Sequence, residues 1–131
     1  MVNDPIADLL TRIRNGYMAH LDAVTVPHSE MKYSICKILE KNDFIESVEN
    51  TMDKDDKKQI TIGLKEFKKG APLPNFKRIS KPGRRVYTKA EELKLVNSGF
   101  GFGIISTPKG LMTNYEARTA KVGGEYLCQV Y

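Results

Sequence analysis

The residues of this chain best suited to chemistry follow an apolar run in its carboxy-terminal third. Ser106, Thr107 and Lys109 come directly after two isoleucines at 104–105, and Gly110 follows them. Hydroxyls both donate and accept hydrogen bonds, and a lysine adds a point charge. Such a set can either activate a nucleophile or bind a sugar–phosphate backbone.

A nucleophile is one interpretation, since Ser106 and Lys109 have the Ser-x-x-Lys spacing of a class of serine acyl-enzymes. Those enzymes also need SDN-type and KTG-type motifs, and this sequence has neither. Pro108 and Gly110 also oppose a continuous helix through the motif. A small serine hydrolase built on Ser106 and Lys109 is therefore the alternative, and we expect a protein that is not an enzyme.

Other potential chemical groups do not form a set. The two cysteines, Cys36 and Cys128, and the two histidines lack metal-ligand spacing, so we expect no metal and no cofactor. We interpret both thiols as reduced and buried, which is typical of a cytosolic protein. The glycines at 99–103 lack the third glycine of a dinucleotide fingerprint and predict a turn packed between aromatic side chains. No apolar run reaches transmembrane length.

RNA binding suits the same residues better. The hydroxyls of Ser106 and Thr107 match the 2′-hydroxyls and base edges of the shallow RNA minor groove. Lys109 can meet a phosphate, and Gly110 and Gly124 allow the backbone to come close. The alternative is that the two hydroxyls merely end a strand.

Basic residues concentrate in one segment of this 131-residue chain, whose net charge is +5. Residues 65–94 carry ten basic and three acidic side chains, whereas residues 1–64 carry eight and eleven. The segment also contains prolines, a rigid Pro82-Gly83 turn and Tyr87, which favour an ordered phosphate contact over a solvated loop. The basic residues that crowd it are Lys65, Lys68, Lys69, Lys77, Arg78, Lys81, Arg84 and Arg85.

The elements that position these residues predict an α+β fold of two small lobes. The first, residues 1–64, has αβαββ order: a helix capped by Asp4, a strand at 24–26, a helix capped by Ser29, and strands at 44–48 and 59–64 around a polar hairpin tip. Residues 65–80 are a basic linker or hairpin. The second lobe, residues 81–131, is mostly β with short helices and carries the RNA-binding residues.

Within this second lobe, residues 84–87 and 125–131 are expected strands. Capping boxes at 88–91 and 113–116 each predict the start of a helix. Gly123 and Gly124 are expected to end the second of these helices through a left-handed residue.

Several stretches, in order, resemble the bacterial-type small-subunit ribosomal protein S8 family over nearly the whole chain. They are Asp4–Asp8, Thr11–Asn15, Lys77–Tyr87, Gly99–Gly101, Ile105–Thr107, Lys109–Gly110, Met112–Thr113, Glu116–Arg118 and Gly123–Glu125. The resemblance implies a non-catalytic protein that binds a helical segment of the central domain of small-subunit ribosomal RNA and supports assembly. It also implies neighbouring ribosomal proteins as partners, repression of its own operon through the mRNA, and residence in a cytoplasmic or organelle ribosome.

The resemblance also implies contact residues. The main loop falls on Ser106, Thr107, Lys109 and Gly110, with Tyr87, Gly124 and Glu125 beside it; a second contact falls on Asp4, Arg14, Asn15, Ser29 and Lys32. Charge adds Lys81, Arg84 and Arg85. Two positions depart from the family pattern: Pro108 replaces a usual serine and removes a hydroxyl and an N–H donor, and Glu30 replaces a common lysine.

Overall fold

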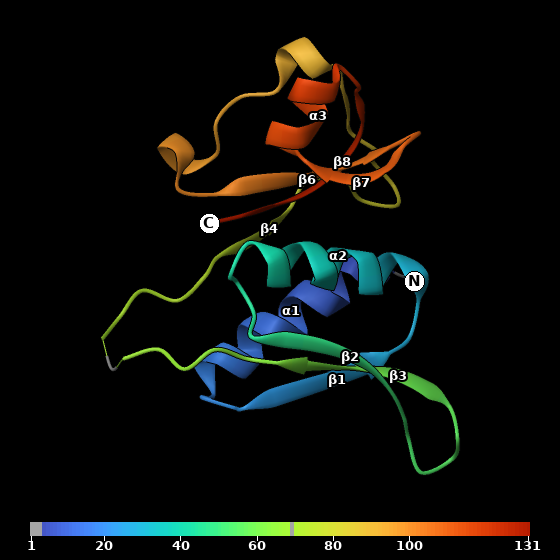
Figure 1. The fold of residues 1–131 in the computed structure, drawn as a ribbon, viewed down its shortest axis with the longest axis vertical. Helices are drawn as coiled ribbons and strands as arrows, with labels where there is room; N and C mark the ends of the chain where they lie inside the picture. The colour runs from blue at the N-terminus through green and yellow to red at the C-terminus, as the bar shows by residue number, and fades with distance from the viewer. Residues whose placement is uncertain (1–3, 69) are drawn as a thin grey trace. The chain divides into compact units, whose positions relative to one another are not determined.

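The computed structural model describes residues 4–68 and 70–131, and these form an α+β fold, as predicted (Figure 1). Contacts between Cα atoms group Asp8–Pro74 into one compact unit. The second unit comprises Asn75–Tyr131 together with residues 4–7 of the described chain. No helix in the described part of the chain is long and apolar enough to cross a membrane.

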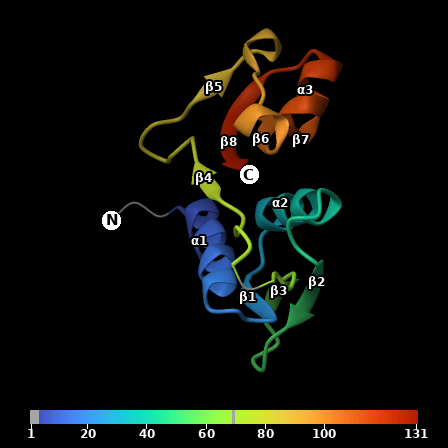
Figure 2. The same ribbon diagram turned by 90° about the vertical axis from the view of Figure 1, so that its left-hand side faces the viewer.

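The Asp8–Pro74 unit is a three-stranded antiparallel sheet with two helices on one face (Figures 1 and 2). Its strands pair in the order β1-β3-β2, so β3 is central. Leu9 and Ile13 of α1, Ile35 and Leu39 of α2, and Ile60 and Ile62 of β3 are fully buried, whereas Met31 at the start of α2 is 41% exposed. The elements are α1 (Pro5–Met18), β1 (Ala23–Pro27), α2 (Glu30–Lys41), β2 (Ser47–Met52) and β3 (Lys58–Gly63).

The other unit is a five-stranded antiparallel sheet with α3 against β6 and β7. The strand β8 is its hub, pairing with β4 and β5 on one side and with β6 on the other. Ala117 of α3 packs on Ile105 of β6 in a small buried cluster. The elements are β4 (Phe76–Arg78), β5 (Tyr87–Thr88), the 3-10 turns η1 (Ala90–Glu92) and η2 (Asn97–Gly99), β6 (Phe102–Thr107), β7 (Gly110–Thr113), α3 (Asn114–Ala120) and β8 (Gly124–Val130).

The predicted caps are largely confirmed. The Asp4 carboxylate accepts the Ala7 N–H at the start of α1, and Ser29 Oγ accepts the Lys32 N–H at the start of α2. The Thr113 capping box opens α3 as expected. The box predicted at 88–91 was wrong by one residue, because the Lys89 N–H donates to Glu92 at 3.3 Å.

Several predicted strands were misplaced. The strand expected at 44–48 runs instead over Ser47–Met52, because pairing with β3 extends it into the presumed hairpin tip. The strand expected at 84–87 is the two-residue β5. Within the segment expected to be a linker or hairpin, residues 76–78 form β4 and pair with β8. The strand β7 was missed, since four residues before a capping box carry little pattern of their own.

One interpretation of the glycines was wrong and another is confirmed in part. The left-handed residue that ends α3 is Lys121, with φ 57°, so Gly123 and Gly124 do not have that role. The turn expected at 99–103 lies against aromatic side chains only in part: a Cβ on Gly103 would lie 2.2 Å from the Tyr126 hydroxyl oxygen, and the Tyr115 hydroxyl donates to the Gly101 carbonyl at 3.2 Å, whereas Phe100 is 82% exposed.

Candidate nucleic-acid interface

Three of the predicted contact residues form one row across the second sheet. Tyr87 of β5 pairs with Glu125 of β8, and Glu125 pairs on its other side with Ser106 of β6. Directly opposite residues in an antiparallel sheet place their side chains on the same face. The register therefore brings together Tyr87, Glu125 and Ser106, which lie up to 38 positions apart in sequence.

The turn after β6 is built by one hydroxyl. Thr107 Oγ1 donates to the Gly110 carbonyl at 2.7 Å and accepts the Lys109 N–H at 3.1 Å. Gly110 has a φ of +109°, which a residue with a side chain rarely adopts. The donor of Thr107 is thus occupied by the turn, whereas the half-buried Ser106 hydroxyl bonds to no residue that the structure describes. Ser106 is the hydroxyl left available to a ligand.

Because Gly124 has no side chain, the backbone of β8 lies close to the backbone of β6 at this site. A Cβ there would lie 2.0 Å from the Ser106 carbonyl oxygen, well inside any real contact distance. The neighbouring Gly123 has the same property, with a Cβ placed 2.3 Å from the Thr88 carbonyl oxygen. Both glycines therefore let β8 run close to the strands that carry Ser106 and Tyr87. The sequence predicted that Gly124 allows close approach, and the structure shows that the approaching group is backbone of the protein itself.

The basic turn at 81–85 is ordered and exposed. Lys81 and Arg84 exchange two backbone hydrogen bonds, at 3.0 and 2.9 Å, so the Pro82-Gly83 turn is tight as predicted. The side chains of Lys81, Arg84 and Arg85 are exposed. Three cations thus project from one short, rigid segment that leads directly into β5.

The residues of the implied second contact are mostly occupied within the protein. Asp4 caps α1 and also pairs with Arg78 at 3.2 Å, with only 18% and 9% of these side chains exposed. Ser29 caps α2, and Lys32 is 8% exposed. Arg14 and Asn15 of α1 are exposed and lie in the other unit, Asp8–Pro74. Of this set, Arg14 and Asn15 offer the most surface.

The two units differ in net charge. The unit that holds the row carries ten Lys and Arg against five Asp and Glu. The Asp8–Pro74 unit carries eleven of each and is neutral. The net charge of the whole chain, +5, is therefore that of one folded unit, and Lys65 and Lys68 of the basic segment 65–94 fall outside this unit. Lys69 lies outside the described residues.

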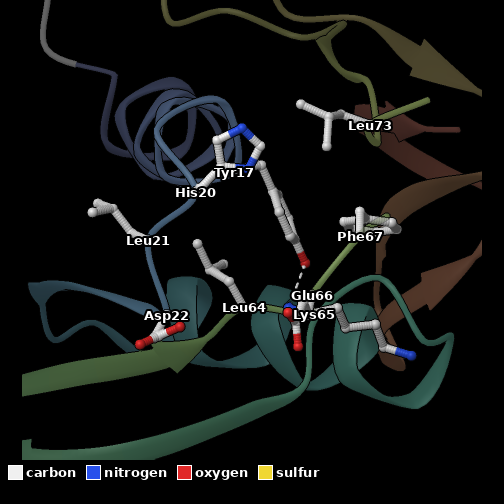
Figure 3. A pocket seen from close by; sticks show the side chains of 9 residues that line it. All are labelled: Tyr17, His20, Leu21, Asp22, Leu64, Lys65, Glu66, Phe67 and Leu73. Carbon is white, nitrogen blue, oxygen red and sulfur yellow. Dashed lines mark hydrogen bonds between the residues drawn. The ribbon is translucent and has the colours of Figure 1, made fainter. Parts of the chain in front are cut away.

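The Asp8–Pro74 unit contains a pocket of about 230 Å³ beside Tyr17 (Figure 3). The Tyr17 hydroxyl donates to the Phe44 carbonyl at 2.6 Å and accepts the Lys65 N–H at 3.3 Å. Burial raises the pKa of this phenol. The lining includes His20, Asp22 and Glu66 but no serine or cysteine. Tyr17 therefore has a structural role, tying Phe44 and Lys65 to α1.

The hydrolase alternative gains no support from the geometry. Ser106 and Lys109 share no hydrogen bond, although the structure describes both residues and the turn between them. A nucleophilic serine needs a base within hydrogen-bonding distance. Burial also raises the pKa of Cys36 and Cys128 to about 12, so neither thiol is a ready nucleophile at neutral pH.

A two-unit α+β fold with its net positive charge on one unit is compatible with a structural protein of the ribosome. The family model of ribosomal protein S8 matches residues 4–131. The small ribosomal subunit protein uS8 of Chloroflexus aggregans is 47% identical over 131 residues, covering 99% of this chain and 98% of that protein. The chain belongs to the ribosomal protein S8 family, which is a family of structural ribosomal proteins rather than enzymes.

Proposed function

We propose that this protein binds a helical segment of small-subunit ribosomal RNA through the Asn75–Tyr131 part of its second unit and thereby supports assembly of the subunit. The interface would consist of the sheet surface at Tyr87 and Ser106, which flank Glu125, together with the 107–110 turn and the basic turn at 81–85. Ser106 would meet a 2′-hydroxyl or a base edge, and Lys109 and the basic turn would meet phosphates.

One observation carries this proposal: the unit that carries the whole net positive charge also contains the Tyr87–Glu125–Ser106 row, with the hydroxyls of Tyr87 and Ser106. Cations alone give binding that is independent of sequence, because they act by releasing counterions. Hydroxyls and close backbone beside the cations add contacts that depend on the shape of the RNA. Their coincidence in one folded unit favours recognition of a structured site.

The test is binding to a ribosomal RNA helix across a salt series. We expect affinity to fall linearly with salt on a log–log plot, and to exceed the affinity for an unrelated single strand. Ser106→Ala should weaken binding by about 1–3 kcal/mol, as expected when a polar partner is left unpaired. Thr119→Ala, an exposed hydroxyl of α3 with no hydrogen-bond partner in the described chain, is the matched control.

Equal affinity for helix and single strand would indicate a general RNA chaperone instead. If the protein hydrolysed an activated ester and Ser106→Ala abolished that activity, the result would support the serine hydrolase alternative. Co-sedimentation with the small subunit tests the cellular placement, which we propose to be the cytoplasmic ribosome with neighbouring ribosomal proteins in contact. An operon mRNA that copies the site would compete for the same surface.

A further inference from the structure

A buried hydroxyl closes the base of the basic turn. Ser80 is fully buried, its Oγ donates to the Glu125 carboxylate at 2.5 Å, and it accepts the Val86 N–H at 3.2 Å. One side chain thus ties together residues 80 and 86, which flank the five-residue segment between them. A loop fixed at both ends has few conformations left to lose when it binds.

Glu125 connects the Ser80 hydroxyl to the Arg85 side chain. The same carboxylate oxygen that accepts the Ser80 hydroxyl also accepts Arg85 Nη1 at 3.1 Å. The Arg85 side chain is still 48% exposed, so part of its guanidinium remains open to solvent. Because a guanidinium has five N–H donors, one bond to Glu125 fixes its position and leaves donors for a phosphate.

The register sets where this cation is held. Glu125 lies between Tyr87 and Ser106 in the cross-strand row, so an arginine bonded to Glu125 lies close to that row. An acidic side chain inside a phosphate-binding surface is unfavourable unless its charge is compensated. Here one oxygen of the carboxylate already has two donors, one of them cationic.

We propose that Ser80 and Glu125 are positioning residues, which hold Arg85 and the basic turn in place for phosphate, and that Glu125 is not itself an RNA contact. This inference rests on the proposed function. It departs from the role that the family resemblance implies for Glu125. Order set before binding lowers the entropy cost of immobilising a long cationic side chain.

The test is a double-mutant cycle with Glu125→Gln and Arg85→Ala, measured as affinity for the ribosomal RNA helix near physiological salt. Glu125→Gln should weaken binding roughly fivefold in the parent and have no further effect when Arg85 is already alanine. Each single change should also reduce the magnitude of the slope of log affinity against log salt concentration by about one. This slope is roughly proportional to the number of phosphates that the protein neutralises.

Glu91→Gln is the control for removal of a negative charge, since Glu91 is exposed and lies in the same unit. It should leave the slope unchanged. Equal weakening by Glu125→Gln in both backgrounds would show direct RNA contact, and tighter binding would show simple repulsion; either result overturns the inference. Failure of the parent protein to bind the helix would instead reject the proposed function. Ser80→Ala, checked for folding by circular dichroism, should reproduce the loss of slope.

Discussion

Replacing Gly124 by alanine tests whether β8 must run against backbone at the candidate interface. The added Cβ would lie 2.0 Å from the Ser106 carbonyl oxygen, 2.8 Å from its carbonyl carbon and 3.1 Å from Thr107 Cα. All three are backbone atoms, so no rotamer change can relieve the clash. The paired strands must separate by about an ångström or more, toward ordinary contact distance.

The cost can be estimated from this geometry. Forcing a methyl group into a packed site typically costs about 1–3 kcal/mol. For a protein of this size that corresponds to a fall in Tm of roughly 4–11 °C. Because the displaced atoms belong to Ser106 and Thr107, binding to the RNA helix should weaken even at temperatures where the variant remains folded.

Gly83→Ala is the matched control for stability. A Cβ on Gly83 has nothing within 4 Å, and its φ is not in the left-handed region. Alanine there should raise stability by about 0.4–1 kcal/mol, since it restricts only the unfolded chain. Thermal unfolding followed by circular dichroism gives both values. Equal melting temperatures for the two variants, with RNA affinity unchanged in Gly124→Ala, would refute the reasoning.

Three further predictions use other contacts. Thr107→Ala should weaken RNA binding by about 1–3 kcal/mol through loss of the turn, whereas Thr107→Ser should bind like the parent in the same titration. Because burial raises the pKa of Cys36 and Cys128 from 9.0 to about 12, stability should hold below pH 9 and fall as pH rises toward 12. Urea midpoints at pH 7.5 and 10 measure this, and equal midpoints would contradict it. Asp4→Ala removes a cap and the partner of Arg78, so unfolding should cost about 2–4 kcal/mol less, and an unchanged urea midpoint would exclude both roles.

Local signals predicted the starts of α1 and α2 well because each start is marked within a few residues. The Asp4 and Ser29 caps and the helical spacing of apolar residues depend on neighbours one to four positions away. Strand ends were less certain. β2 extends to Met52 only because β3 offers backbone partners as far as Lys58, and those lie across the hairpin. Strand boundaries depend on pairing, which is not local.

The candidate interface divides in the same way. The residue types at 106–110, the cationic segment and the family are all readable from the chain, since they depend on identity and order alone. That Tyr87, Glu125 and Ser106 form one row follows only from the register of β5, β8 and β6. Likewise, the Thr107 hydroxyl donates within its own turn, and the Glu125 carboxylate accepts hydrogen bonds from both Ser80 and Arg85.

The sequence by itself therefore determined which side chains are available, where helices begin, and which family the chain resembles. Only the tertiary structure decided which hydroxyl is free, which glycine approaches which carbonyl, and which unit carries the charge. The physical reason is that hydrogen-bond partners and close contacts are made across strands between residues far apart in the chain. Their identity depends on register, which single-residue patterns do not encode.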